Sequence, residues 1–117
     1  LIINGERDLS VPVSGGQPGG RFADAWSGQP LKPISSQSRF WAEANACQVG
    51  PDKQYSATHV RWRYRCPEGQ EVERVLVTGM GHAWPGGRSA GPRADDPASP
   101  FDATREIWRL FSQPRRP

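Results

Sequence analysis

The stretch that decides the fold is Val75-Leu76-Val77-Thr78-Gly79-Met80-Gly81-His82-Ala83-Trp84-Pro85-Gly86-Gly87. It begins with a β-branched apolar run, which is typical of a buried strand, and it continues as a glycine-rich loop. A sheet holds such a loop rigid and leaves its tip free for chemistry. Gly79 and Gly81 are expected to adopt backbone angles that other residues resist, which would aim His82 outward. Histidine also exchanges a proton near neutral pH. The pattern therefore predicts a strand that presents His82, although a histidine in an ordinary turn fits it too.

The composition indicates one small domain with long irregular segments. Of 117 residues, 35% are hydrophobic, and the chain holds 13 glycines and 12 prolines. The net charge is +3, and the cations are scattered among acids, which argues against a nucleic-acid partner. No apolar stretch approaches the roughly 20 residues of a membrane-spanning helix. We expect a single partial domain over residues 1–117, with no membrane span.

The first half of the chain predicts a strand, a long loop and a helix. The opening apolar run, residues 1–3, is interpreted as the end of a buried strand that has been cut from a longer protein. Residues 13–35 are rich in glycine and proline and are expected to form a lid-like surface loop. Helical spacing of apolar residues then predicts a helix over residues 36–47, with Phe40 and Trp41 on its apolar face.

The second half predicts two strands and a final helix. Residues 58–65 alternate strictly, so Val60, Trp62 and Tyr64 share one side of a half-exposed strand. The other side is expected to be polar surface and carries His59, Arg61, Arg63 and Arg65. Residues 71–78 return as a second strand, which predicts an antiparallel hairpin. The final helix starts near Pro100, or at Asp102 as its cap, and its apolar face is expected to be core: Ala103, Ile107, Leu110 and Phe111, with Trp108 beside them.

The two cysteines, Cys47 and Cys66, leave two states open. No CxxC pair occurs, which disfavours a zinc site, and no metal or cofactor is expected. Spacing alone does not choose between a disulfide and two free thiols. A disulfide would imply an oxidising compartment.

Asp8 and His82 each follow a predicted strand. Groups beyond the carboxyl ends of neighbouring strands in an α/β sheet converge on one crevice, so we expect these side chains to meet. A carboxylate that accepts the Nδ1 proton of a histidine leaves Nε2 free to act as a base. An acid followed by a histidine is also the chain order of the last two members of an α/β-hydrolase triad. The adjacent pair Asp95 and Asp96 is interpreted as solvated charge or a turn.

Four segments of the chain carry a resemblance to a known family. They are residues 4–12 (Asn4 to Pro12, with Asp8), residues 41–47 (Trp41 to Cys47), residues 79–87 (Gly79 to Gly87, with His82) and residues 101–108 (Phe101 to Trp108). In this order they resemble secreted esterases of the polyhydroxybutyrate depolymerase and feruloyl or acetylxylan esterase type. The chain departs from the family at Asn4, where histidine is usual, and at Ala46, where glycine is usual. Both departures bear on loop geometry and substrate preference.

The resemblance implies both a fold and a site. The fold is α/β, the carboxy-terminal portion of an α/β-hydrolase sheet with its last strands, a hairpin-like pair and the final helix. Asp8 would be the triad acid and His82 the general base. Cys47 and Cys66 would form a disulfide in a protein exported from the cell, either extracellular or periplasmic. Trp84 and Trp26 are expected to bind substrate, against the simpler roles of core packing for Trp84 and loop anchor for Trp26.

The nucleophile is missing from these residues. No Gly-x-Ser-x-Gly elbow occurs in the chain, so the serine and the oxyanion-hole amides are expected upstream of Leu1. The missing amino-terminal part of the fold would then be the partner of this chain, and the 117 residues alone should be inactive. The substrate would be a carboxylic ester, either a polyester or an ester of plant cell walls.

Two other functions stay open at this point. The chain would be a non-catalytic binding module if the arginines and aromatics of residues 59–65 engaged an acidic polymer or polysaccharide. It would also have no activity if it were a degenerate gene product.

Overall fold

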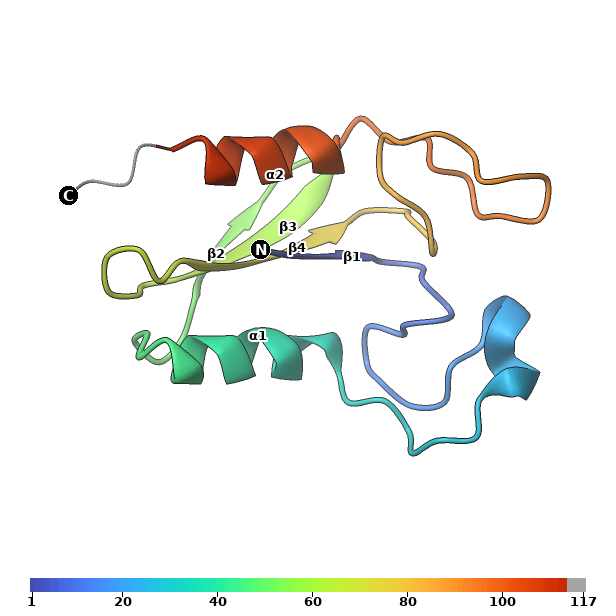
Figure 1. The fold of residues 1–117 in the computed structure, drawn as a ribbon, viewed down its shortest axis with the longest axis horizontal. Coiled ribbons are helices and arrows are strands. Elements are labelled where there is room, and N and C mark those ends of the chain that lie inside the picture. Colours follow the sequence, from blue (N-terminus) through green and yellow to red (C-terminus); the bar gives the residue numbers. More distant parts are fainter. Residues whose placement is uncertain (114–117) are drawn as a thin grey trace.

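The computed structural model describes residues 1–113 and places their four strands in one mixed sheet, in the order β1-β4-β3-β2. Helix α1 covers one face of this sheet and α2 the other, which confirms the expected α/β character (Figure 1). Within residues 1–113, no helix combines the length and the apolar composition that crossing a bilayer requires. The elements are β1 (Ile2–Gly5), the short 3-10 helix η1 (Gly20–Ala25), α1 (Ile34–Ala44), β2 (Asp52–Tyr55), β3 (His59–Tyr64), β4 (Val72–Val77) and α2 (Ala103–Phe111).

Strand β4 is the centre of the sheet. It pairs antiparallel with β3, which confirms the predicted hairpin, and parallel with β1, where Gly5 lies opposite Val77. Because β1 and β4 run in the same direction, their carboxyl ends lie at the same edge of the sheet, and the loops that follow them start side by side (Figure 1). The outer side of β1 pairs with no other strand of residues 1–113.

The hydrophobic core lies between β4 and the start of α2. Val75 and Val77 are fully buried, as the apolar run predicts, and they pack with Met80, Phe101 and Ala103. This cluster is small, in keeping with the low hydrophobic content of the chain. It lies directly behind the loop that carries His82, and Ala83 of that loop packs against it.

The sequence pattern does not predict β2. All of its residues are exposed, because β2 is an edge strand that pairs only with β3 and has no element covering it. A strand without a buried face has no apolar alternation that would reveal it.

Helix α1 buries a different face from the one that its aromatic residues predict. It spans residues 34–44 rather than 36–47, so residues 34–35 of the predicted 13–35 loop are helical. Phe40 and Trp41 are 60% and 50% exposed, so the predicted apolar face is wrong. The buried positions are Ile34, Ser38 and Ala42. Two of these side chains are small and let the helix lie close to the sheet, where Ser38 Oγ is 3.3 Å from the hydroxyl of Tyr64.

Helix α2 begins at the predicted cap but does not bury the predicted residues. Asp102 accepts a hydrogen bond from the backbone N–H of Arg105 at 2.9 Å, as an N-cap should. Trp108 and Phe111, however, are 72% and 74% exposed, and Ala103 is the only fully buried residue of the helix. The expectation of a large apolar contact is therefore wrong, and ion pairs hold α2 instead.

These ion pairs form the arginine–glutamate cluster between α2 and the sheet. Arg61 is only 8% exposed, so the side of β3 that was expected to be polar surface is covered at this residue, whereas Arg63 on the same side stays exposed. It donates to Glu73 at 2.5 Å and to Glu106 of α2 at 2.6 Å. The other members are Arg63, which donates to Glu73, and Arg109, which donates to both carboxylates. Burial disfavours the charge of Glu73 most, but the bonds and charges of the arginines outweigh it and lower the pKa of Glu73.

His59 is also more enclosed than the alternation predicts. Its ring meets the ring of Phe101 edge-on at 4.9 Å between centroids, and its Nδ1 lies 2.9 Å from the hydroxyl of Thr58. Burial and, after it, the charge of Arg61 lower the pKa of His59. The interpretation of His59 as a simple surface residue is therefore wrong, because the start of α2 lies over it.

A disulfide joins Cys47 to Cys66, which settles the state of the two cysteines. It links the segment after α1 to the end of β3. Helix α1 ends in a Schellman motif, in which Cys47 N–H bonds to Ala42 and Ala46 N–H bonds to Glu43. Ala46, the C′ residue of this motif, has φ +53, the left-handed conformation that glycine adopts more easily.

Candidate functional site

Two loops meet beyond the carboxyl ends of β1 and β4. The first follows β1 and carries Asp8, and the second follows β4 and carries His82. Main-chain hydrogen bonds join them, from Glu6 N–H to Val77 O at 3.0 Å and from Arg7 N–H to Met80 O at 2.7 Å. The carboxylate of Glu6 adds a third bond by accepting from Gly79 N–H at 2.8 Å. These three hydrogen bonds join the two loops independently of the Asp8 and His82 side chains.

Three glycines allow these loops to come into contact. The structural requirement for glycine differs from one position to the next. A Cβ on Gly5 would lie 2.4 Å from the carbonyl oxygens of Met80 and Gly81, so the contact is backbone against backbone. Gly79 has φ +72, as its place in the turn predicts. Gly81 does not adopt the left-handed conformation, so that expectation is wrong. It must lack a side chain because a Cβ there would lie 2.3 Å from a carboxylate oxygen of Asp95.

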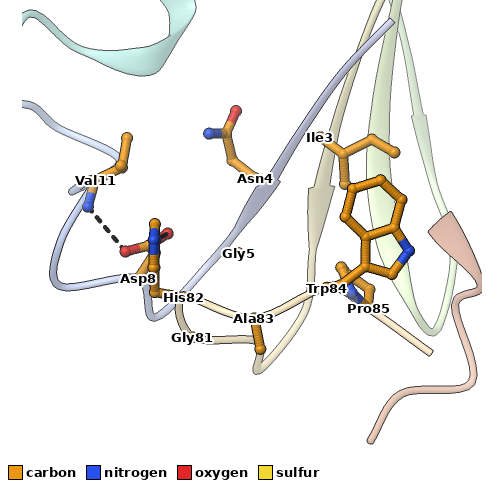
Figure 2. A pocket seen from close by; sticks show the side chains of 10 residues that line it. All are labelled: Ile3, Asn4, Gly5, Asp8, Val11, Gly81, His82, Ala83, Trp84 and Pro85. Carbon is orange, nitrogen blue, oxygen red and sulfur yellow. Dashed lines mark hydrogen bonds and ion pairs between the residues drawn. The ribbon is translucent and has the colours of Figure 1, made fainter. Parts of the chain in front are cut away.

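The structure brings Asp8 and His82 together. Asp8 Oδ2 lies 2.9 Å from His82 Nδ1, and Asp8 Oδ1 accepts from Val11 N–H at 2.8 Å, so both oxygens of the carboxylate are held (Figure 2). The Asp8 side chain is 7% exposed and that of His82 is 53% exposed. A carboxylate at Nδ1 favours the tautomer with its proton there, which leaves Nε2 unprotonated on an exposed ring. This geometry suits an imidazole that takes a proton from an approaching group.

A cleft of about 340 Å³ opens beside this pair. Its lining includes Asp8, His82 and Trp84, together with Asn4 of β1, and Figure 2 shows these side chains around it. Trp84 is 54% exposed, which excludes core packing, and its Nε1 donates to Thr104 Oγ1 at 3.0 Å. Asn4 Oδ1 is buried without a hydrogen-bond partner in residues 1–113. The cleft therefore combines the proton-transfer pair with an aromatic wall.

Trp26 does not line this cleft. It lies at the end of η1, is 42% exposed, and donates from Nε1 to Gln29 O within its own loop at 3.2 Å. Its ring also covers Gly28, where a Cβ would lie 2.8 Å from the indole. These contacts fit an anchor of the 13–35 loop. A substrate-binding role for Trp26 stays a prediction, as does the lid-like role of the loop.

The arginines of strand β3 already have acidic partners. Arg61 is buried in the arginine–glutamate cluster, and Arg63 donates to Glu73 at 2.9 Å. Arg65, just after the strand, lies 3.6 Å from Asp52. A binding surface for an acidic polymer needs cations that are not already neutralised. The observed pairing therefore disfavours the binding-module alternative for residues 59–65.

Sequence reasoning missed two residues that shape the site. Glu6 bonds to the turn at Gly79, and Asp95 Oδ2 accepts from His82 N–H at 2.6 Å. Neither carboxylate has a sequence signal, because each acts on a main-chain N–H that lies at least thirteen residues away in the sequence. Among the described residues, no group of three or more His, Cys, Asp or Glu side chains is placed to hold a metal ion.

No protein-family model, curated protein or solved structure matches this chain. The site geometry must therefore support a function without help from relatives. What it offers is a buried carboxylate, an imidazole that is oriented through Nδ1 on a side chain 53% exposed, and an adjoining cleft with an aromatic wall.

Proposed function

We propose that the chain is the carboxy-terminal part of a secreted serine esterase with an α/β-hydrolase fold. The observation that supports this most is the 2.9 Å contact between Asp8 Oδ2 and His82 Nδ1 beyond two adjacent parallel strands. The motif resemblance adds the substrate class, a carboxylic ester of a polyester, a feruloyl group or an acetylated polysaccharide. The Cys47–Cys66 disulfide fits an oxidising compartment and therefore supports export.

In this proposal His82 is the general base and then the general acid. Its Nε2 takes the proton of a serine hydroxyl while the serine oxygen attacks the ester carbonyl. The imidazolium then gives that proton to the leaving alcohol, and water later releases the acyl group by the same steps in reverse order. Asp8 stays ionised, stabilises the imidazolium and keeps Nδ1 protonated. Trp84 forms an apolar wall for the acyl or alcohol group in the cleft.

The serine must come from a segment upstream of Leu1 in this proposal. Strand β1 supports such an arrangement, because its outer side has unpaired backbone groups beside the cleft. A further parallel strand at this edge would end close to His82, and a nucleophile on the turn after it would be within reach. The backbone amides of the oxyanion hole would come from the same upstream part.

Steady-state hydrolysis by the full-length protein tests the proposal. Short-chain p-nitrophenyl esters, feruloyl esters, acetylated xylan and polyhydroxybutyrate are the probes. His82→Ala should lower kcat by several decades while the protein stays folded, because the serine loses its base. His59→Ala is the matched control, since it removes the other histidine of the chain and should leave kcat nearly unchanged. Near-full activity of His82→Ala would refute the assignment, as would a wild-type protein that hydrolyses none of the esters.

A further inference from the structure

We propose that Asp95 is a positioning residue that holds the main chain of His82 from thirteen residues further along the same connection between β4 and α2. The inference deepens the proposed esterase function and rests on it for its kinetic readout. Asp95 touches neither the imidazole nor the cleft in this arrangement. It acts through the backbone N–H of His82, and the loop that carries it lies between the histidine and the start of α2.

The contact between Asp95 and the histidine loop is close and specific. Asp95 Oδ2 accepts from His82 N–H at 2.6 Å. The carboxylate also fills the space beside Gly81 where a side chain would begin, since a Cβ there would lie 2.3 Å from Oδ2 and 2.9 Å from Cγ. The glycine and the carboxylate are therefore complementary. This explains why Gly81 is a glycine although its backbone conformation does not require one.

The loop that carries Asp95 is itself anchored. Gly86 N–H donates to Pro97 O at 2.9 Å, and Ala103 N–H donates to Pro85 O at 3.0 Å. Pro97 is buried, so the segment just after Asp95 is fixed against the turn that follows His82. Asp95 is itself exposed, and an exposed carboxylate on a free loop would contribute little, because water would compete for the N–H. Here the main-chain bonds hold the carboxylate in place and keep it beside the histidine.

His82 is therefore oriented from several directions. Asp8 fixes the ring through Nδ1, Asp95 fixes the main chain at the amide, and Glu6 fixes the start of the turn at Gly79. Without Asp95, the segment between Gly79 and Trp84 loses its bond on the side away from β1, and the ring gains freedom about its productive position. A displacement of about 1 Å at a catalytic group costs on the order of 100-fold in rate. Substrate binding should change little, because Asp95 is not among the residues that line the cleft.

Kinetics of the full-length protein test this role. Asp95→Ala should lower kcat by about 10- to 100-fold, with KM within about two-fold, because the catalytic geometry relaxes while the cleft stays intact. Asp95→Asn keeps an acceptor oxygen and should restore kcat to within about three-fold of the wild type. Asp96→Ala is the matched control. Within residues 1–113 the Asp96 carboxylate accepts only from Ala98 in its own loop, so its removal should leave kcat unchanged.

A second measurement does not depend on ester turnover. Nitrogen-15 NMR of the same proteins reports the imidazole tautomer of His82 and the solvent exchange of its amide. The wild type should have its ring proton at Nδ1 and a slowly exchanging amide. Asp95→Ala should speed that exchange at least ten-fold and broaden the ring signals, and Asp95→Asn and Asp96→Ala should do neither. If the wild type hydrolyses no ester, the proposed function fails while this measurement still tests Asp95.

Gly81→Ala provides an independent variant, because the new methyl group would expel the Asp95 carboxylate. It should lower kcat about as much as Asp95→Ala does, and the double variant should be no worse than either single one. The role of Asp95 is overturned if Asp95→Ala leaves both kcat and amide exchange unchanged. It is equally overturned if Asp96→Ala matches its effects, or if the two single losses multiply in the double variant.

Discussion

Two places where carboxylates meet nitrogen-containing side chains differ in how far the nitrogen-bearing partner is buried. In the arginine–glutamate cluster, Glu73 is 3% exposed and accepts from Arg61, Arg63 and Arg109. At the strand ends, Asp8 is equally well held, but the ring it contacts is 53% exposed. The bond to Asp8 uses Nδ1, and within residues 1–113 Nε2 has no hydrogen-bond partner that would have to be displaced.

This difference indicates a structural role for the arginine–glutamate cluster and a chemical role for the Asp8–His82 pair. A guanidinium stays protonated throughout the ordinary pH range, and the buried one of Arg61 serves to hold α2 on the sheet through its bond to Glu106. An imidazole with one nitrogen fixed and the other exposed has a defined tautomer and a free lone pair. We therefore expect changes in the cluster to alter stability and changes at the Asp8–His82 pair to alter turnover. The following predictions test that separation.

The largest effect is expected for Asp8→Asn in the full-length protein. The new side chain can still accept from Val11 N–H through Oδ1, which leaves its NH₂ group facing His82 Nδ1. A donor at that place favours the wrong tautomer, with the ring proton on Nε2. We expect kcat for ester hydrolysis to fall about 10⁴-fold with little loss of stability. A fall of less than ten-fold, or an equal loss for Asp96→Asn, would contradict the role of Asp8.

The complementary change in the cluster is Glu73→Ala. It leaves Arg61 buried with only Glu106, so the free energy of unfolding from urea denaturation should fall by about 3 kcal/mol. Turnover per folded molecule should stay near that of the wild type. Arg65→Ala breaks an exposed pair, with side chains 62% and 59% exposed, and should cost no more than about 1 kcal/mol. Equal losses of unfolding free energy for Glu73→Ala and Arg65→Ala would show that burial does not determine how much an ion pair contributes to stability.

Acid should lower the free energy of unfolding in two steps, each smaller than the loss expected for Glu73→Ala. Burial opposes the charge of both Glu73 and Glu106, yet the arginines around them lower each pKa below 4.5. Burial, followed by Arg61, lowers the pKa of His59 below 6.5. In each case the unfolded chain binds a proton more readily, so stability is present at higher pH and is lost as pH falls. The free energy of unfolding should decline first below about pH 6.5 and again below about pH 4.5.

Two substitutions assign these steps. His59→Gln should remove the first decline, and Glu73→Gln should reduce the second. Urea denaturation between pH 7 and pH 3 measures both. Stability that stays level from pH 7 to pH 5 in the wild type would contradict the assignment of the first step to His59.

The smallest expected effect comes from Ala46→Gly. This residue lies away from the arginine–glutamate cluster and from the Asp8–His82 pair. Relief of the left-handed conformation at φ +53 should raise the free energy of unfolding by about 1 kcal/mol. The kcat for ester hydrolysis should not change, because the turn is at the far end of α1 from the cleft. A thermal melt and a kinetic assay on the same preparation check both points. A rise in kcat would mean that turnover follows overall stability. The effects of the arginine–glutamate cluster on stability and of the Asp8–His82 pair on turnover would then not be separable.

The sequence predicts the strands that have a clear hydrophobic pattern. It also predicts the contact between Asp8 and His82, because that contact follows from the order of the strands in the sheet. The apolar run ending at Val77 and the strict alternation of residues 58–65 identify β4 and β3, because β4 is almost wholly buried and the apolar side of β3 is partly buried. Asp8 and His82 are predictable as a pair because neighbouring parallel strands end at one edge. Strand β2 is not predictable, since hydrogen bonds to β3 and not burial define it.

The remaining differences between the predicted and the observed structure concern which faces of the helices are buried. Helical periodicity alone does not determine this, because it depends on which elements pack together. Phe40, Trp41 and Trp108 fit helical periodicity but lie on faces that no described element covers. The face of α1 that meets the sheet is chosen by small side chains, and α2 is held by charges that an alternating strand suggests to be solvated. The role of Asp95 is equally hidden, because its partner is a main-chain N–H thirteen residues away.

The unpaired side of β1 also determines how these residues will behave when they are produced alone. It presents a row of free N–H and C=O groups next to Ile2 and Ile3, whereas the opposite edge, β2, carries Asp52 and Lys53. Charged edges resist strand addition and apolar edges invite it. A preparation of the 117-residue chain should therefore self-associate as its concentration rises, edge to edge through β1. A lysine in place of Ile2 is the first change to make for soluble material.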